Sequence, residues 1–472
     1  MSTKSRTKTF LFRTSAIFII IILALVALPA LPAYAAACTF TSAATGSWGT
    51  AGTWSAVGVG CGTYPGSGFA GDTVIIASGN IVTLNVSPTN AIASLTVTGT
   101  LTSTATQTLN VTGNVAGTGV ISGPGSGTGT TIVFGGDWTF SGTGPNGSTS
   151  SVSPTANGSV NQTLNGNFAF RTITINKSGG TLFITGSLTF SSAFTLTAGN
   201  VNYSAAADQS VLAGTYPGNL TLSGSGTKTS AGVITVDSNL VVGDGVTFSH
   251  GASSLTVTGT TTIGGGTSGN LTLTSTSGTK TFVGLVTVNP GATWDDSINE
   301  AVTLRGGLTN NGTFIAGTAV YTFNTNNQAL TGIISIPKVT VTGVTLTNNN
   351  ALTVGTALAG NGGLTQAAGS TLNIGGTSTV TTLTATAAGN TVNYYGAVQT
   401  VKTATYDNVV FSGSGAKKVA TGTSINENLS VALSGSATAS INAGLNISAG
   451  TLTLGGLGRI NGEWGSTSSA AT

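Results

Sequence analysis

The residues of this chain best suited to chemistry are a group of carboxylates and a lone histidine. Asp295 and Asp296 are adjacent in the segment TWDDSINE, which also contains Glu300, and His250 is the only histidine among 472 residues. Paired carboxylates can hydrolyse a glycosidic bond, because one protonates the leaving oxygen while the other attacks the sugar or activates water. These four side chains are therefore the candidates for catalysis.

The Asp-Asp pair and the dipeptide 250–251 (His-Gly) resemble motifs of the β-helical polygalacturonases. Here the His-Gly precedes the acidic pair, which reverses the order found in that family. The family's upstream Asn-Thr-Asp is missing, and residues 459–461 (Arg-Ile-Asn) lack the lysine of its downstream Arg-Ile-Lys. We therefore interpret TWDDSINE as a solvated turn and FSHGASS as a polar loop, and we predict no catalytic residue.

Other site chemistry has little support. Asp295, Asp296 and Glu300 could form at most a weak surface calcium site, and eleven scattered carboxylates are few for the calcium cluster of a lyase. Ser-His-Asp catalysis would depend on the single histidine, and no Gly-x-Ser-x-Gly elbow lies between a predicted strand and a helix. We expect no metal and no cofactor.

The N-terminus has the composition of a secretory leader. Residues 1–13 are basic and polar, residues 14–31 are largely apolar, and residues 33–35 (Ala-Tyr-Ala) give the small-x-small pattern that signal peptidase cleaves. We predict a signal peptide over residues 1–35 and a secreted, extracellular protein at the cell surface. An uncleaved anchor is the alternative, because the apolar stretch approaches the length of a membrane span. No second hydrophobic span follows.

Charge argues against nucleic acid as a partner. Only 5% of the residues are charged, and four of the fourteen basic residues lie in the leader. The remaining ten face eleven carboxylates, so the mature chain carries a net charge of about −1. A basic surface for phosphates is therefore unsupported.

Cys38 and Cys61 are the only cysteines. In an exported chain, a pair 23 residues apart favours a disulfide over a metal site, which needs more ligands. A lipoprotein acylated at Cys38 is the alternative, but the preceding box lacks the usual leucine and Cys61 would be left unpaired. We predict a Trp-rich and Cys-rich N-terminal cap module over residues 36–89, stapled by this bridge.

Residues 90–472 consist of short strand-like phrases with glycine corners. SLTVTGTLT, RTITINKS and KVTVTGVTLT alternate apolar residues with Thr or Asn, and Gly-rich dipeptides end each phrase. The phrase at 198–232 returns at 388–422, and repeats of this kind stack. We predict an all-β, right-handed parallel β-helix, that is, a degenerate β-solenoid. Tandem β-sandwich domains are the alternative, disfavoured because core-filling Trp is rare after Trp54.

The repeats share several anchor positions. Segment 141–160 is poor in apolar residues and is typical of a long excursion or a domain boundary. The lysines would form a sparse stripe that could touch acidic glycans, or would keep corners soluble and discourage edge pairing. The glutamines indicate stacked amides inside a turn. The anchors are Gln162, Gln209, Gln328, Gln399, Lys177, Lys228, Lys280 and Lys417.

Resemblance to known families points to a surface protein. The segment GSWGTAGTWSAVGVGCGTYPGSGFAGDTVII resembles the opening module of large bacterial surface proteins and, distantly, the extracellular domain named for its eight glycines. Phrases such as LTNNGTFIAGTAVYTF and NLTLSGSGTKT resemble secreted β-helical repeat proteins and haemagglutinin-type or autotransporter-type adhesins of bacteria. This resemblance implies a secreted structural or adhesive protein whose partners are surface glycans or other envelope components.

The same residues also fit two other functions less well. A carbohydrate-active enzyme on a β-helix scaffold, either a glycoside hydrolase or a polysaccharide lyase, is the main alternative. Regular Thr-x-Thr rows also occur in ice-binding solenoids, where hydroxyls and methyls order water. That function requires a uniform turn length, and the spacing of the anchors drifts, so we do not expect it here.

Overall fold

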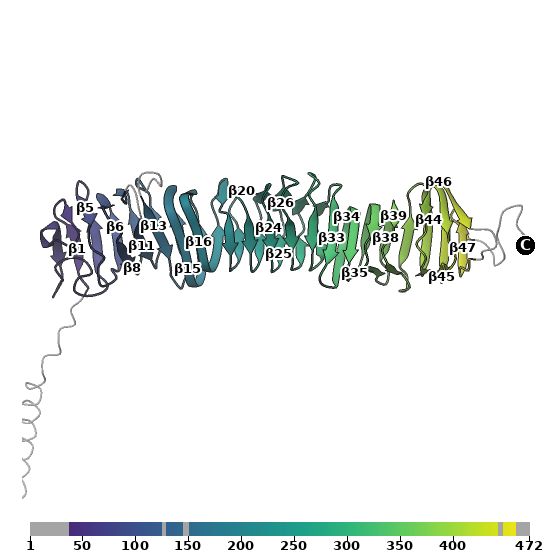
Figure 1. The fold of residues 1–472 in the computed structure, drawn as a ribbon, viewed down its shortest axis with the longest axis horizontal. Coiled ribbons are helices and arrows are strands. Elements are labelled where there is room, and N and C mark those ends of the chain that lie inside the picture. Colours follow the sequence, from purple (N-terminus) through teal and green to yellow (C-terminus); the bar gives the residue numbers. More distant parts are fainter. Residues whose placement is uncertain (1–36, 125–128, 145–150, 442–446, 459–472) are drawn as a thin grey trace, which may run out of the picture.

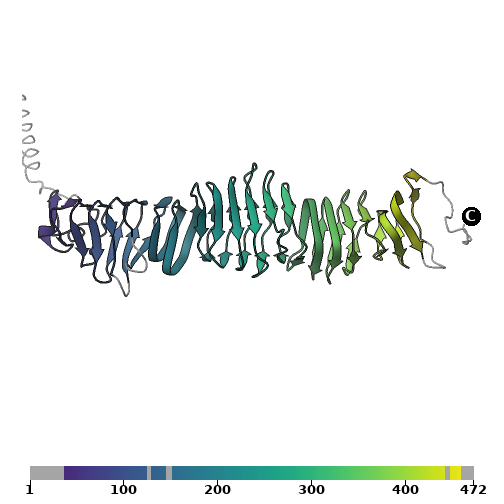
Figure 2. The same ribbon diagram turned by 90° about the horizontal axis from the view of Figure 1, so that it is seen from above.

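The strands stack turn upon turn into one elongated rod (Figure 1, Figure 2). This computed structural model describes residues 37–124, 129–144, 151–441 and 447–458, and the predicted leader at 1–35 lies outside them. The rod is an all-β parallel β-solenoid of about 18 turns, which confirms the predicted fold class. The β-sandwich alternative is wrong, because strands pair in parallel with strands one turn away.

Each central turn contributes one short strand to each of three faces. The first face contains β17 (Gln209–Val211), β20 (Gly226–Ser230), β23 (Val246–His250), β26 (Asn270–Leu273), β29 (Thr293–Asp295) and β32 (Thr313–Ile315). The second face contains β18 (Gly214–Tyr216), β21 (Ile234–Val236), β24 (Leu255–Val257), β27 (Lys280–Phe282), β30 (Val302–Leu304) and β33 (Val320–Asn324). The third face contains β19 (Leu220–Leu222), β22 (Leu240–Val242), β25 (Thr261–Ile263), β28 (Val286–Val288) and β31 (Leu308–Asn310).

The core consists of the apolar half of each alternating strand, because successive side chains of a strand point to opposite sides. One inward row of the second face runs through five turns, and each member pairs with the next: Val236, Val257, Phe282, Leu304 and Phe323. All five side chains are buried. Stacking like residues on adjacent turns therefore builds one continuous core.

Tryptophan contributes more to this core than its rarity in the sequence suggested. Trp138 and Trp294 are both fully buried. The ring of Trp294 lies 5.2 Å from that of Phe282 and 5.1 Å from that of Phe314, measured between centroids. Rings from neighbouring turns thus fill the interior where the turns are wide.

Turn length varies along the rod. Thr345 pairs with Gly363, 18 residues later, whereas Thr261 pairs with Val286, 25 residues later. The segment predicted as an excursion at 141–160 contributes β13 (Val152–Ala156), which pairs in parallel with β11 (Thr130–Phe134), and its residues 145–150 lie outside the described residues. No helix in the described part of the chain is long and apolar enough to span a bilayer.

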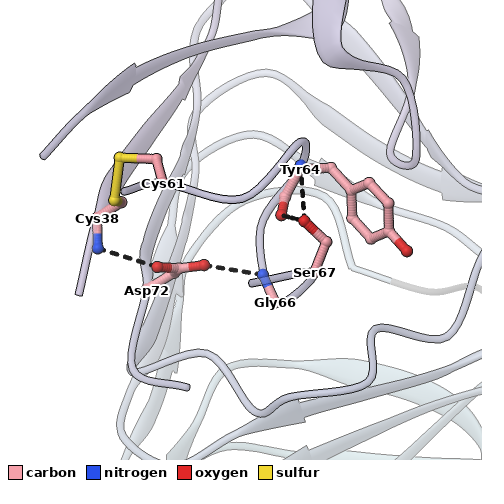
Figure 3. Close-up of a disulfide and its surroundings, with 6 residues drawn as sticks. All are labelled: Cys38, Cys61, Tyr64, Gly66, Ser67 and Asp72. Carbon is pink, nitrogen blue, oxygen red and sulfur yellow. Dashed lines mark hydrogen bonds between the residues drawn. A yellow bond between two sulfur atoms is a disulfide. The ribbon is translucent and has the colours of Figure 1, made fainter. Parts of the chain in front are cut away.

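The N-terminal cap departs from the parallel pattern. Strand β1 (Thr39–Ser42) pairs antiparallel with β3 (Trp54–Val57) and parallel with β4 (Thr73–Ile76), which starts the stack. Cys38 and Cys61 form the predicted disulfide beside it (Figure 3). The bond uses the sulfur atom that acylation of Cys38 would require, which argues against the lipoprotein alternative.

A buried aspartate ties the disulfide to the neighbouring turn. Oδ1 of Asp72 accepts a hydrogen bond from the backbone N–H of Cys38 at 2.9 Å, and Oδ2 accepts one from that of Gly66 at 2.9 Å (Figure 3). Asp72 is 2% exposed, so these charge-assisted bonds compensate for its loss of water. The cap is therefore held by one covalent and several polar contacts.

Candidate functional site

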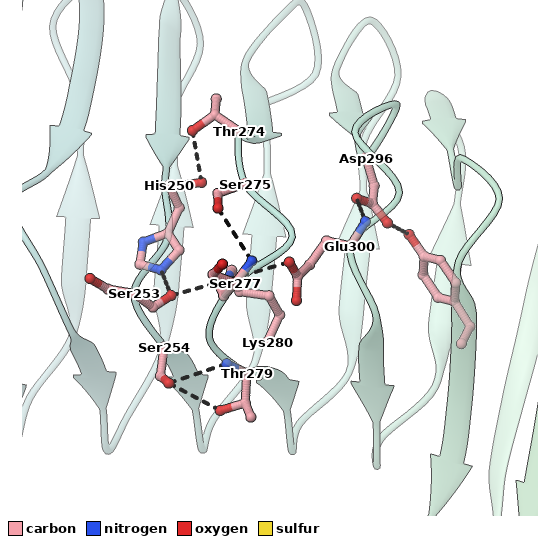
Figure 4. Close-up of polar contacts among 11 residues, drawn as sticks. His250, Ser253, Ser254, Thr274, Ser275, Ser277, Thr279, Lys280, Asp296 and Glu300 are labelled. Atoms are coloured by element: carbon pink, nitrogen blue, oxygen red, sulfur yellow. Dashed lines mark hydrogen bonds and ion pairs between the residues drawn. The ribbon is translucent and has the colours of Figure 1, made fainter.

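Most of the candidate catalytic side chains lie inside the corner between the first and second faces (Figure 4). His250 ends β23, and Asp296 and Glu300 lie in the loop 296–301 after β29. His250 and Asp296 are 0% exposed and Glu300 is 2% exposed. The prediction of solvated turns is therefore wrong at these three positions, because the corners fold their polar side chains inward. Asp295 belongs to the outward row and is half-buried.

A single backbone carbonyl connects the histidine to a lysine of the next turn. The oxygen of Ser253 accepts a hydrogen bond from Nζ of Lys280 at 3.0 Å and lies 2.8 Å from Nε2 of His250. Nζ of Lys280 also donates to the oxygen of Ser277 at 2.8 Å. The same nitrogen lies 3.9 Å from Oε2 of Glu300, which makes an ion pair between adjacent turns.

Asp296 forms the other end of this network. Its Oδ1 accepts a hydrogen bond from the backbone N–H of Glu300 at 2.8 Å, and its Oδ2 accepts one from the hydroxyl of Tyr321 at 2.7 Å (Figure 4). Tyr321 belongs to β33, one turn further along. Both carboxylate oxygens are thus occupied by donors of the protein itself.

Burial controls the protonation of these groups, because a low dielectric favours the neutral form. Desolvation raises the pKa of Asp296 to about 6, although the bonds from Tyr321 and from the Glu300 amide oppose the change. Burial also raises the pKa of Glu300, against the attraction of Lys280. The same effect lowers the pKa of Lys280, which Glu300 and Asp296 oppose, and lowers that of His250.

The hydrogen bonds of His250, Lys280 and Asp296 join groups of the fold itself. A glycosidase needs two carboxyl groups on either side of the bound sugar, whereas Asp296 and Glu300 are turned into the rod and Asp295 faces outward. An external groove lined by Val111, Gly135 and Ser159 lies several turns away. No group of three or more His, Cys, Asp or Glu within the described residues is placed to hold a metal ion.

The recurrent lysines are buried, so the prediction of an exposed stripe or of soluble corners is wrong. Exposure does not exceed 2% for Lys177, Lys228, Lys280 or Lys417. Their ammonium groups donate to carbonyl oxygens; Lys228, for example, bonds to those of Ala205, Ala207 and Ser225. Lys228 follows the corner between the third and first faces and Lys280 the corner between the first and second, so the lysines do not share one stripe.

The recurrent glutamines are also inside and bond to the backbone. Nε2 of Gln209 donates to the oxygen of Ile184 at 2.9 Å and to that of Gly186 at 2.8 Å. Gln399 makes the same two bonds, to carbonyls 25 and 23 residues before it. These amides thus satisfy carbonyls of the preceding turn and do not stack on one another. The four buried amides are those of Gln162, Gln209, Gln328 and Gln399.

Sequence reasoning missed a tyrosine pair in each copy of the repeat. The hydroxyl of Tyr216 donates to the oxygen of Leu212 at 2.8 Å and lies 2.9 Å from the hydroxyl of Tyr203. In the second copy, the hydroxyls of Tyr394 and Tyr406 lie 2.8 Å apart. The available signal was a second tyrosine shortly before the repeated glutamine in each copy.

The outward surface carries rows of threonine. On the second face, seven threonines occupy consecutive turns, and each pairs with the next: Thr215, Thr235, Thr256, Thr281, Thr303, Thr322 and Thr340. The third face has a second row, interrupted once by a valine: Thr221, Val241, Thr262, Thr287, Thr309 and Thr331. We call these two rows the second-face ladder and the third-face ladder.

The two ladders keep a constant relation although turn length varies. The corner that joins the second and third faces has three residues in five successive turns: 217–219, 237–239, 258–260, 283–285 and 305–307. Extra residues enter at the other two corners, such as 251–254 against 274–279. The turn length therefore varies without breaking the alignment of the threonine rows.

Comparison of the chain with protein-family models, curated proteins and solved structures finds no match. A fold hosts many functions, so the solenoid alone does not indicate one. The function must therefore be argued from the buried corner network, the cap and the threonine ladders.

Proposed function

We propose that this chain is a secreted or cell-surface structural protein that uses its long flat faces for attachment and has no catalytic activity. The observation that carries the proposal is the second-face ladder, in which seven outward threonines repeat without interruption. The candidate catalytic groups, in contrast, are mostly turned inward and bonded to the fold. The secretory leader and the stapled cap fit an exported rod.

The proposed partners are uncharged polymers of the cell envelope, such as surface glycans. A threonine hydroxyl both donates and accepts hydrogen bonds, as do the hydroxyls of a sugar. Strand spacing repeats this group about every 4.8 Å along the ladder. The buried lysines do not offer a basic stripe, so acidic glycans are disfavoured as the main target.

Fractionation of cells that produce a tagged chain tests location: retention on the envelope or release into the medium fits the proposal, and cytoplasmic accumulation contradicts it. Attachment is tested by co-sedimentation with insoluble envelope polysaccharides. Replacing Thr256, Thr281 and Thr303 by Val removes three hydroxyls and keeps the β-branched shape. Binding should fall about a hundredfold, as expected for three hydrogen bonds of about 1 kcal/mol each that act together.

The matched control replaces Thr247, Thr293 and Thr313 of the first face by Val. These threonines belong to an outward row that Asn270 interrupts. Binding should remain at the unmodified level in this variant. Equal losses in both triple variants would show that the second-face ladder has no special role in attachment.

Ordering of water at an ice surface is a second candidate function, favoured by the same ladder. Its methyl and hydroxyl groups repeat at the strand spacing, and the constant corner holds the third-face ladder at a fixed distance beside it. Freezing hysteresis and ice-crystal shape are the measurements. Faceted crystals that become round with the Thr256, Thr281 and Thr303 replacements would support this function over attachment.

The carbohydrate-active enzyme remains the weaker alternative, since Asp295 is the one outward member of its carboxylate group. Release of reducing ends from polysaccharides is the measurement, and we expect none above background. Release that Asp295→Asn abolishes would reinstate the enzyme.

A further inference from the structure

Among the buried lysines, Lys280 differs from the others in having a buried carboxyl group beside it. Its Nζ lies 3.9 Å from Oε2 of Glu300, and the two side chains are 0% and 2% exposed. Lys280 begins β27, and Glu300 lies two residues before β30, the strand that pairs with β27. The two groups therefore belong to successive turns of the solenoid.

Two hydrogen bonds orient the amine of Lys280 so that the third side of its nitrogen faces this carboxyl group. Nζ donates to the oxygens of Ser253 and Ser277, at 3.0 and 2.8 Å, and these bonds fix two of its hydrogens. The remaining position of the nitrogen faces Glu300 (Figure 4). Oε2 of Glu300 has no hydrogen-bond partner among the described residues, although it is buried. An unpartnered buried oxygen is costly, so its retention here needs an explanation.

The surroundings keep water away from both groups. Lys280 occupies an inward row in which its partners on the adjacent strands are Leu255 and Val302. Both of these neighbours are buried. Asp296 accepts the backbone N–H of Glu300 and thereby positions the start of the loop that carries the carboxyl group. Burial shifts the pKa of the amine down and that of the Glu300 carboxyl up, against their mutual attraction, and both shifts favour the neutral forms.

We propose that Lys280 and Glu300 condense into an intramolecular amide bond that joins two successive turns. The lone pair of the neutral amine attacks Cδ of the protonated Glu300 carboxyl group, and an N–Cδ bond forms. The bond from Cδ to the carboxyl hydroxyl breaks, and that hydroxyl leaves with one hydrogen of the amine as one molecule of water. No oxidant, reductant or cofactor is needed, and both buried charges disappear.

The proposed bond would lie where it can hold two adjacent turns of the rod together. Turns of a solenoid contact only their neighbours, so a weak interface anywhere allows the stack to open there. A covalent link along the axis would close one such interface in the middle of the chain, while the disulfide secures the cap. Lys228, with the same burial but no carboxylate within ion-pair distance in the described part of the chain, remains a free amine.

Mass spectrometry of the full chain tests the proposal directly. The intact denatured protein should be lighter, by the mass of one water, than the mass calculated for its sequence from the N-terminus that it carries, with the disulfide counted. Trypsin cleaves after free lysine and arginine, and Lys280 is the only residue of either type between Lys228 and Arg305. An amide at Lys280 should block this cleavage and yield a looped peptide 229–305 that lacks one water, in place of peptides 229–280 and 281–305.

Two variants isolate the bond. Lys280→Arg keeps a positive charge but cannot form the amide, so the full sequence mass should return. Lys228→Arg alters an equally buried lysine and should leave the water loss at position 280 in place. Because the mass of the unmodified chain already decides the question, poor folding of a variant does not prevent a result.

The contrary results are equally distinct. A full-mass chain that trypsin cleaves after Lys280 would show that Lys280 and Glu300 form an ion pair only. A water loss that mild alkali reverses, with cleavage at Lys280 intact, would identify a cyclic imide at an aspartate such as Asp244, which precedes a glycine. Either result overturns the amide and leaves the proposed attachment function unaffected.

Discussion

Two corners of the rod bury a lysine in different ways. At the corner between the third and first faces, Lys228 donates to three backbone carbonyl oxygens at 2.7, 2.9 and 3.1 Å. At the corner between the first and second faces, Lys280 donates to two carbonyl oxygens and has Glu300 beside it. Both lysines are at most 1% exposed. In both corners, backbone carbonyl oxygens surround the ammonium group, an arrangement that we call the carbonyl cage. Only the corner of Lys280 also has a buried acid beside the lysine.

The difference shows what a solenoid corner needs. Corner carbonyls point inward without a strand partner, and a buried carbonyl without a donor is unfavourable. A lysine ammonium supplies three donors at the end of a flexible stem and satisfies several of these carbonyls at once. Lys228 is buried with no carboxylate within ion-pair distance in the described part of the chain, and Asp208 acts on it only from further away. A buried acid such as Glu300 is therefore not required for burial of the lysine.

The largest effect should come from removing the lysine that faces the acid. Whether Lys280 is paired or condensed with Glu300, Lys280→Met leaves a buried carboxyl group without a partner, and such a loss destabilises a protein by about 3–5 kcal/mol. The midpoint of urea unfolding measures the change. The double variant Lys280→Met, Glu300→Leu should regain part of the loss, because an apolar pair replaces both groups. A double variant that is less stable than the single one would contradict this account.

A smaller effect is expected at the corner without an acid. Lys228→Met leaves the carbonyl oxygens of Ala205, Ala207 and Ser225 without their donor, but it leaves no buried negative charge without a partner. The loss should be about 1–3 kcal/mol, the penalty for unsatisfied buried groups. The same unfolding measurement applies. A loss as large as that of Lys280→Met would show that the carbonyl cage, rather than the acid, sets the energetics of both corners.

Smaller still should be the contribution of the tyrosine pair in the turns that precede Lys228. Tyr203→Phe removes a hydroxyl that accepts the backbone N–H of Leu212 at 3.1 Å and contacts Tyr216. A loss of about 1 kcal/mol is expected for a buried hydrogen bond. Tyr394→Phe in the second copy of the repeat is the matched variant and should cost the same. Unequal losses would show that the two copies are not energetically equivalent.

The smallest net effect is expected on the pH dependence of stability, because the carboxyl groups and the histidine at the Lys280 corner act in opposite directions. The folded pKa of Asp296 is raised to about 6, so its contribution to stability falls as the pH rises from about 4 to 6. The folded pKa of His250 is lowered from 6.5, so its contribution rises as the pH approaches 6.5 from below. The folded pKa of Glu300 is raised by burial, against the attraction of Lys280, so its contribution falls with pH as that of Asp296 does.

Asp296→Asn should therefore make stability rise more steeply with pH between about 4 and 6, because one of the two carboxyl groups that oppose His250 is then removed. Thermal unfolding at intervals of pH measures the slope for the variant and the unmodified chain. The corner of Lys228 holds neither a histidine nor a buried carboxyl, so Lys228→Met should leave the slope unchanged. A slope that Asp296→Asn does not alter would show that Asp296 titrates at its ordinary pKa in the fold.

Much of the scaffold was readable from short-range patterns. Alternation of apolar residues with Thr predicts strands with one inward row, and glycine corners end them. Gly278, for example, has φ of +79° in the corner 274–279, and an added Cβ would lie 2.6 Å from the backbone of Ser253. The pairing of Cys38 with Cys61 also followed from their being the only cysteines of the chain. These features depend on residue type and on neighbours in the sequence.

The tertiary structure alone decided which polar residues lie inside. His250, Asp296 and the recurrent lysines have the composition of solvated turns, yet stacking buries them and gives them partners within the fold. The lysines donate to backbone carbonyls, whereas Asp296 accepts from the Glu300 amide and from the hydroxyl of Tyr321 one turn further along. The tertiary structure also decided that the threonines align. Register is set by hydrogen bonds between strands, and extra corner residues bulge outward without shifting those bonds. The sequence by itself thus determined the solenoid and its disulfide, whereas contacts between turns determined which polar groups are buried and how the surface threonines align.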